Sequence, residues 1–325
     1  MNVMVSTLKL VYPPVSNQEA EWVKSDPDVE ALIRSSDFYM IGARAEAWFE
    51  DDVTVEDSQI RVPISTEDGF RDEVVLEPFA LAEATLGEVP ETLTFDLGPK
   101  MIRFFGGTDD EVEAGTAELF EWFTTEKLIC DRGRCLPGVH GFDRFRELGT
   151  YDLLYVGIAK ATDTFDRLFD GAHHARQKIL SNEWPRRPGA RVTDEMILFP
   201  LRVESSGFRT LGEDDALTDV SPGGWEAHHK VVVIDAEKAF VHLLEPKYNV
   251  EKFASYPRSK DGLYGYGYQR YGFVLIENLT FLTANHTFRG SGQPRYGLFD
   301  NYADMLTTSG DTVELYIAPD RPSRQ

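Results

Sequence analysis

The chain is poor in cysteine and in long apolar runs, and each shortage argues against a class of protein. Its 325 residues include two cysteines, too few for a disulfide framework, and Cys130 and Cys135 have no second pair that would complete a zinc site. No apolar run approaches the roughly 18 residues of a membrane span. Residues 1–15 lack the basic and apolar segments of a secretory signal. We therefore expect a reducing, cytoplasmic setting and no membrane partner.

Two common catalytic motifs are also missing. The sequence contains no G-x-S-x-G, and neither cysteine has a persuasive histidine partner, which argues against a hydrolase with a nucleophilic serine or cysteine. It contains no G-x-x-x-x-G-K-[ST] loop, which argues against a nucleoside triphosphatase.

Basic residues are in deficit, and the deficit is local. The formal net charge is −22, from 33 lysines and arginines against 55 aspartates and glutamates. Residues 1–125 contain 8 of the basic and 27 of the acidic residues, so the rest of the chain is nearly neutral. This acidity opposes nucleic-acid binding by the first part of the chain but not by the second. We predict an acidic mixed α/β accessory domain over residues 1–125, able to dock on a protein partner.

Periodicity in these first residues predicts strands and two helices. Short apolar or alternating runs predict strands near residues 8–15, 59–65, 72–86 and 92–107. Helical spacing predicts helices over residues 17–34 and 111–123. Residues 130–141, rich in Gly, Arg and Pro, are typical of a boundary loop. Residues 253–325 predict a β-rich C-terminal extension.

The middle of the chain alternates strands and helices. Residues 151–159 form an apolar run with aromatic and β-branched side chains, typical of a buried strand. A helix follows, with Asp163 or Thr164 as its N-cap. Residues 195–204 predict another strand, and Asp235 is a candidate cap for the last helix of this region.

That last helix carries a carboxylate on an otherwise apolar face. The residues spaced three and four apart on this face are Val233, Glu237, Phe240, Val241 and Leu244. An ionised carboxylate on a buried face is costly unless a cation or a metal ion pairs with it. The sequence leaves three interpretations open: a salt bridge to Arg167 or Arg176, a wet edge of the face, or a functional site.

Several residues follow one another in a characteristic order. A strand contains Tyr155-Val156-Gly157, the next helix carries Arg167, and Glu237 stands nine residues before Pro246 in a Pro-x-Tyr-Asn ending at Asn249. This order resembles the GIY-YIG nuclease family, and the ending is similar to that of its excision-repair members. The resemblance covers residues 136–252. It implies an α+β fold, a small three-stranded sheet with flanking helices, between the acidic domain and the C-terminal extension.

Three features depart from the family pattern. Its first signature, Gly-Ile-Tyr, is best matched by Gly138-Val139-His140, where histidine replaces tyrosine, or is approached by Tyr151 from within the second strand. Ile158 stands where a lysine often follows the second signature. A long insertion also precedes the helix that bears Glu237. These departures bear on catalytic competence more than on the fold.

The resemblance implies roles for individual residues. Glu237 would bind Mg²⁺ (or Mn²⁺), which neutralises charge on the phosphate and holds the leaving oxygen, and Arg167 would grip phosphate oxygens. Tyr155 is the candidate for activating the attacking water, with Tyr151 or His140 as a substitute. The candidates for contact with nucleic acid are His173, Lys178, Arg186, Arg187 and Asn249.

Two functions of different classes follow from this pattern. The first is a metal-dependent endonuclease that hydrolyses phosphodiester bonds in DNA, in the restriction of foreign or modified DNA or in repair. The second is a catalytically degraded nuclease fold that acts as a regulatory or acidic docking subunit. Convergence of Tyr155, Arg167 and Glu237 on one cleft would favour the enzyme.

Overall fold

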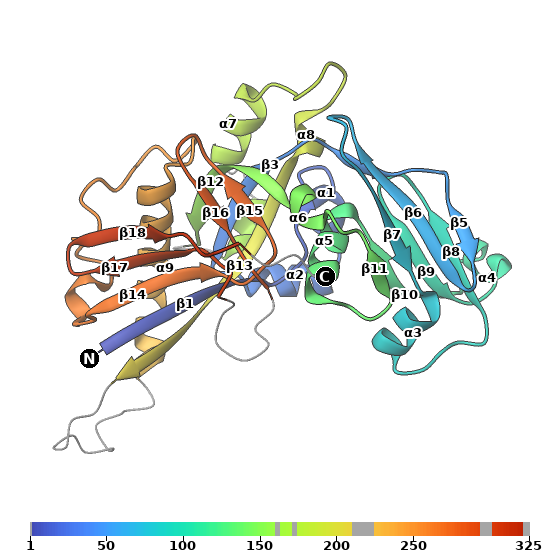
Figure 1. Ribbon diagram of the computed structural model, residues 1–325, viewed down its shortest axis with the longest axis horizontal. Coiled ribbons are helices and arrows are strands. Elements are labelled where there is room, and N and C mark those ends of the chain that lie inside the picture. Colours follow the sequence, from blue (N-terminus) through green and yellow to red (C-terminus); the bar gives the residue numbers. More distant parts are fainter. Residues whose placement is uncertain (1, 160–162, 171–173, 210–223, 293–300, 321–325) are drawn as a thin grey trace. The chain divides into compact units, whose positions relative to one another are not determined.

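Strands from both ends of the chain pair in one mixed sheet (Figure 1). The computed structural model describes residues 2–159, 163–170, 174–209, 224–292 and 301–320. Over these residues the sheet has ten strands, in the order β16-β15-β12-β3-β13-β1-β14-β17-β18, with β2 paired to β13. The first strand of the chain, β1, lies inside the sheet, antiparallel to β13 and parallel to β14. The fold is therefore mixed α and β, but the sheet is larger than the three-stranded one that the resemblance implied.

The elements of this part are β1 (Asn2–Leu10), β2 (Val15–Ser16), α1 (Ala20–Val23), α2 (Pro27–Arg34), β3 (Phe38–Ala43), β12 (Thr150–Ile158), the π-helix η1 (Phe165–Asp170), α7 (His174–Asn182), α8 (Val192–Glu195), β13 (Met196–Arg209), α9 (Gly224–Leu244), the 3-10 helix η3 (Leu263–Tyr266), β14 (Arg270–Leu275), β15 (Thr280–Leu282), β16 (Thr287–Arg289), β17 (Met305–Ser309) and β18 (Thr312–Tyr316).

The chain separates into two units that differ from the three predicted domains. The first unit comprises residues 1–44, 151–185 and 191–325, and the second comprises residues 45–150 and 186–190. The predicted acidic domain, 1–125, is divided between them because β1 and β3 are interior strands of the ten-stranded sheet. The predicted extension, 253–325, supplies β14 to β18 to that same sheet. Most of the second unit is thus one long insertion between β3 and β12.

Helix α9 packs against the ten-stranded sheet through the predicted apolar face. Phe240 contacts Phe38 of β3 and Phe288 of β16, with ring centroids 5.5 and 5.1 Å apart in edge-to-face geometry. The other apolar members of the face, Val233, Val241 and Leu244, are also buried, which confirms its orientation. The predicted cap for this helix was wrong: α9 begins at Gly224, so Asp235 lies inside it.

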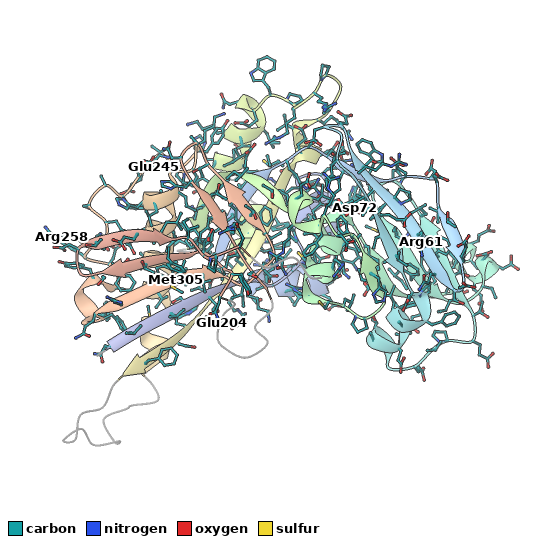
Figure 2. All side chains as sticks on the ribbon, in the orientation of Figure 1. Arg61, Asp72, Glu204, Glu245, Arg258 and Met305 are labelled. Carbon is teal, nitrogen blue, oxygen red and sulfur yellow. The ribbon has the colours of Figure 1, made fainter. Side chains whose placement is uncertain are left out.

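The second unit contains two sheets. One has the order β11-β7-β6-β4 with β5 on β6, and the other has the order β10-β9-β8. Phe104 of β9 and Phe123 of β10 pack edge to face in the core, 6.2 Å apart. Figure 2 labels Arg61 of β6 and Asp72 of β7 in this unit. Residues 45–150 hold 25 acidic and 9 basic residues, so the acidity of the N-terminal third lies mainly here.

The elements of this unit are β4 (Ala47–Phe49), β5 (Thr54–Glu56), β6 (Gln59–Thr66), β7 (Arg71–Leu76), α3 (Pro78–Leu86), β8 (Leu93–Leu97), β9 (Ile102–Gly106), α4 (Asp109–Glu113), β10 (Glu118–Phe123), α5 (Thr125–Arg134), β11 (Val139–Gly141) and α6 (Phe145–Leu148).

Several predicted elements have other limits or another type. The helix predicted over 17–34 forms as two helices, because Asp26 caps a new helix that starts at Pro27. The helix predicted over 111–123 was wrong: α4 ends early, Gly115 adopts a left-handed φ of 69°, and β10 follows as a strand. The boundary loop predicted over 130–141 is instead the end of α5 followed by β11. Of the helices that the structure describes, none combines the length and apolar character needed to cross a membrane.

We predict that the insertion can be removed without unfolding the first unit. Ala43 of β3 faces Asp152 of β12 in antiparallel register, so joining Arg44 to Tyr151 by Asn-Gly restores a two-residue hairpin. The shortened chain should keep a cooperative thermal transition by circular dichroism. Deleting residues 1–44 instead removes β1 and β3 and should abolish that transition. A shortened chain that melts without cooperativity would contradict the independence of this unit.

Candidate functional site

Two tyrosines lie side by side where β3 and β12 pair. Tyr39 of β3 is directly opposite Gly157 of β12, and its ring stacks on that of Tyr155 with centroids 6.0 Å apart and planes 27° apart. The Tyr155 side chain also raises the pKa of the Tyr39 phenol. A Cβ atom at position 157 would lie 2.5 Å from the Tyr39 hydroxyl oxygen. The glycine of the Tyr155-Val156-Gly157 motif is therefore what admits the Tyr39 ring.

Arg167 joins this pair from the short helix η1. Its Nη1 donates a hydrogen bond of 2.9 Å to the carbonyl of Ile158, at the end of β12. Its guanidinium carbon lies 5.9 Å from the centre of the Tyr39 ring. The turn that carries Arg167 begins as predicted at Asp163, whose carboxylate accepts from the N–H of Asp166 at 2.9 Å. Arg167 is half-buried, so the guanidinium retains access to solvent.

Glu237 completes the cluster from α9. From Asp235 to Val241 every residue of this helix is buried, including three charged ones. Asp235 accepts hydrogen bonds from Tyr256 Oη and from the N–H of Leu263, both at 2.8 Å. Lys238 forms a salt bridge with Asp261. Glu237, 7% exposed, lies near enough to Tyr39 for its negative charge to raise the pKa of that phenol.

The pKa of Tyr39 is raised above its ordinary value. Burial is the largest cause, the Tyr155 and Glu237 side chains add to it, and the positive charge of Arg167 opposes it. Tyr39 therefore remains a neutral phenol at neutral pH and can donate a hydrogen bond. Tyr39 and Glu237 form the buried side of the cluster, whereas Tyr155 and Arg167 are partly exposed.

Asn249 holds β12 from the segment that follows α9. Its Oδ1 accepts from the N–H of Val156 at 2.9 Å, and its Nδ2 donates to the carbonyl of the same residue at 2.7 Å. The preceding residue, Tyr248, donates its N–H to the carbonyl of Leu154 at 2.9 Å. Asn249 is 8% exposed, so its amide positions the strand of Tyr155 and does not fit the predicted contact with nucleic acid.

The two predicted substitutes for Tyr155 lie in other surroundings. Tyr151 is buried against Phe199 and Phe281, with the guanidinium of Arg44 5.4 Å from its ring centre. His140 lies in the second unit, on β11, with Nε2 3.4 Å from a carboxylate oxygen of Glu77. The strand beside β12 is β3, whereas Val139 and His140 lie on β11, which pairs with β7 in another sheet.

The other predicted residues are placed as follows. Lys178 on α7 is exposed, and so are Arg186 and Arg187 in the segment after it. His173 lies outside the described residues. Arg176, considered as a partner for Glu237, is buried and donates to Asn17 and to the carbonyl of Leu168. Burial lowers its pKa, in part offset by the charge of Glu21.

Tyr39 was not among the predicted site residues. The signal lies in Asp37-Phe38-Tyr39, an apolar residue followed by tyrosine, as at the end of Gly-Ile-Tyr. A second pair outside the predicted residues lies at the start of β3, where Asp37 Oδ2 is 2.7 Å from His229 Nε2 of α9. Burial raises the pKa of Asp37, although hydrogen bonds from the Val203 N–H and from His229 oppose that shift.

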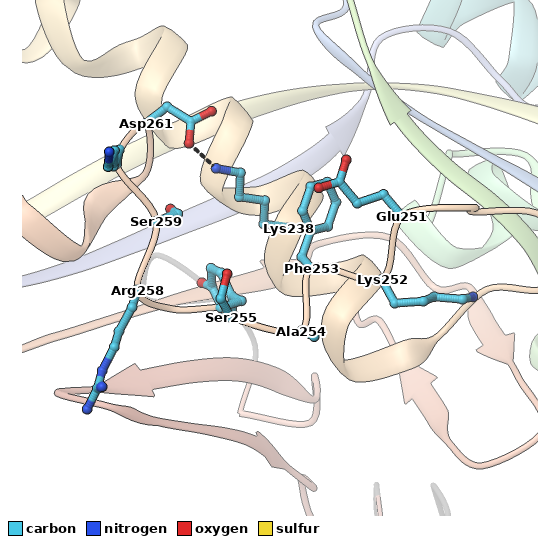
Figure 3. A pocket seen from close by; sticks show the side chains of 11 residues that line it. Lys238, Glu251, Lys252, Phe253, Ala254, Ser255, Arg258, Ser259 and Asp261 are labelled. Carbon is cyan, nitrogen blue, oxygen red and sulfur yellow. Dashed lines mark hydrogen bonds and ion pairs between the residues drawn. The ribbon is translucent and has the colours of Figure 1, made fainter.

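A separate pocket of about 800 Å³ adjoins α9 at Lys238. Figure 3 shows the salt bridge of Lys238 with Asp261 at its wall, and Lys252 and Arg258 extending in different directions. Because these cations do not converge, the pocket lacks the arrangement that binds a phosphate. Over the residues that the structure describes, no group of three or more His, Cys, Asp or Glu side chains could hold a metal ion. Among the described residues, a metal site at Glu237 would therefore include fewer than three such side chains.

Comparisons of this chain with protein-family models, with curated proteins and with solved structures found no match.

We predict that Asp235 makes stability depend on pH. Burial, only partly offset by the hydrogen bonds from the Leu263 N–H and Tyr256, raises its pKa to about 6. Because the folded state holds this proton more tightly than the unfolded state, the contribution of Asp235 to the free energy of unfolding falls as pH rises from 4 to 6 and then levels off. Relative to Asp235→Asn, the wild type should lose on the order of 3 kcal/mol between pH 4 and pH 7 in urea unfolding. Parallel pH profiles of the two proteins would contradict this.

Proposed function

We propose that the protein is a metal-dependent endonuclease that hydrolyses phosphodiester bonds in DNA, in the restriction of foreign or modified DNA or in repair. The observation that carries the proposal is the cluster of Tyr39, Tyr155, Arg167 and Glu237, contributed by β3, β12, η1 and α9. Three of these residues come from the ordered motif that resembles the GIY-YIG nucleases. The fourth, Tyr39, supplies a tyrosine on the strand next to the Tyr-Val-Gly motif.

The donor set suits Mg²⁺ (or Mn²⁺). This ion binds one or two carboxylates and fills its remaining positions with water and phosphate oxygens, so a single buried carboxylate such as Glu237 can hold it. When bound, it would neutralise charge that develops on the phosphate and on the leaving oxygen. Arg167, whose Nη1 is fixed by the Ile158 carbonyl, has further N–H groups for the non-bridging phosphate oxygens.

The two tyrosines have different tasks in this proposal. Tyr155 is the more exposed, so its hydroxyl orients the attacking water and relays its proton: the hydroxyl takes the water's proton as its own proton passes to solvent. The water oxygen bonds to phosphorus as the bond to the leaving oxygen breaks. Tyr39, kept neutral by its raised pKa, would donate a hydrogen bond to Tyr155 and fix the direction of that hydroxyl.

Cleavage should require the buried carboxylate. Plasmid, modified phage DNA and RNA incubated with Mg²⁺ or Mn²⁺ should reveal a cut substrate, and Glu237→Gln should reduce the rate by about a hundredfold or more. Glu245→Gln is a matched control, because this exposed carboxylate directly follows the same helix (Figure 2). Tyr39→Phe should also slow cleavage, since it removes the hydroxyl that orients Tyr155. Equal rates for Glu237→Gln and Glu245→Gln would refute the proposal.

The charge of the insertion favours a second candidate, a regulatory or docking role. With 25 acidic and 9 basic residues, segment 45–150 could screen a DNA site on the same chain or occupy a basic partner. If the insertion screens a DNA site, the shortened protein, in which Asn-Gly joins Arg44 to Tyr151, should bind DNA more tightly than the full chain in EDTA. The difference in affinity should shrink as the salt concentration rises. Equal DNA affinity of the two chains at low salt would count against screening.

A further inference from the structure

Trp184 is the most exposed aromatic side chain of the described residues, with 87% of its surface open to solvent. It follows α7 and precedes Pro185. Tryptophan is usually well buried because its ring is large and apolar, and it is enriched where proteins meet their partners. The exposed Trp184 indole is therefore a candidate for a ring that a ligand covers.

The residue beside Trp184 is anchored near the candidate site. Glu183 accepts hydrogen bonds from Lys247 Nζ at 2.6 Å and from Tyr248 Oη at 2.5 Å. Its backbone N–H also donates to the carbonyl of Ile179 at 2.8 Å. Tyr248 in turn adjoins Asn249, whose amide holds Val156 of β12. A short series of hydrogen bonds thus connects the backbone at Trp184 to the strand that carries Tyr155.

The segment around Trp184 has the charge of a polyanion-binding surface. Residues 174–191 contain five lysines and arginines and one glutamate, in a chain of net charge −22. Lys178, in the same unit as Trp184, is exposed, and the single glutamate accepts hydrogen bonds from Lys247 and Tyr248. Cations that flank an aromatic residue in the sequence suit a nucleic-acid strand, since cations follow the phosphates and the ring stacks on a base.

We propose that Trp184 stacks on a nucleobase of a DNA strand bound at the Tyr39–Glu237 cluster. The inference rests on the proposed nuclease function and adds a base-contacting residue to it. Such stacking accepts any base, so Trp184 sets affinity and position along the strand rather than sequence preference. An apolar pocket on a protein partner is the competing occupant. The surrounding positive charge favours the nucleic acid.

The test measures binding in EDTA, where metal-dependent cleavage is suppressed. Fluorescence anisotropy compares a labelled single strand with an abasic strand of the same length and charge. The wild type should bind the base-containing strand about tenfold more tightly, Trp184→Ala should lose that preference, and Trp184→Phe should keep most of it. Trp22→Ala is the matched control, because Trp22 is 58% exposed and lies on α1 in the same unit.

Several results would overturn the stacking site. They are a Trp184→Ala protein that binds like Trp22→Ala, an equal loss of affinity for both strands, or a wild type that binds neither. An equal loss would assign Trp184 to positioning or to a protein contact. Cleavage that depends on Glu237 but not on Trp184 would leave the proposed nuclease standing without this site. Preference for the base-containing strand without any cleavage would refute the proposed nuclease activity but support stacking of Trp184 on a base.

Discussion

The ring of Tyr39 lies over β12 only because position 157 has no side chain. This contact requires β3 and β12 to be neighbours in one register, with Tyr39 opposite Gly157. The same register sets Tyr155 diagonally across from Tyr39 on one face, where side chains of this length meet. Arg167 and Glu237 then reach that face from η1 and α9. A larger residue at position 157 would displace Tyr39 and break the cluster, even if Tyr155, Arg167 and Glu237 kept their positions.

Two sets of contacts position α9 and the segment after it against β3 and β12. Asn249 satisfies both backbone groups of Val156, and Phe240 of α9 packs on Phe38 next to Tyr39. Leaving buried backbone groups unpaired is costly, so the Asn249 hydrogen bonds fix the position of the segment after α9 along β12. The contact of Phe240 with Phe38 fixes the position of α9 along β3. Together they bring Glu237 to Tyr39 through contacts that do not involve Glu237 itself.

The parts of the site that lie within one element could be predicted from sequence, and the part that depends on distant pairing could not. The three- and four-residue spacing of its apolar neighbours places Glu237 on the buried face of α9, whereas Arg167 was matched only through the resemblance to the nuclease family. Tyr39 was missed because residues 44–149 separate its strand from β12, and local periodicity carries no information on such pairing. The predicted boundary at residue 125 differs from the division into two units for the same reason: charge changes there, but β1 and β3 pair with strands that begin after residue 149.

The three buried charges of α9 differ in what an apolar replacement would cost. Asp235 and Lys238 hold Tyr256, Leu263 and Asp261, so they organise the segment that follows the helix. Glu237 is buried near Tyr39, and burying an ionised carboxylate costs free energy unless a cation or hydrogen bonds stabilise it. That carboxylate also raises the pKa of Tyr39, so the two groups disfavour each other's charge. In the proposed nuclease, a cation bound beside a phosphate would offset the cost of the charge on this buried acid.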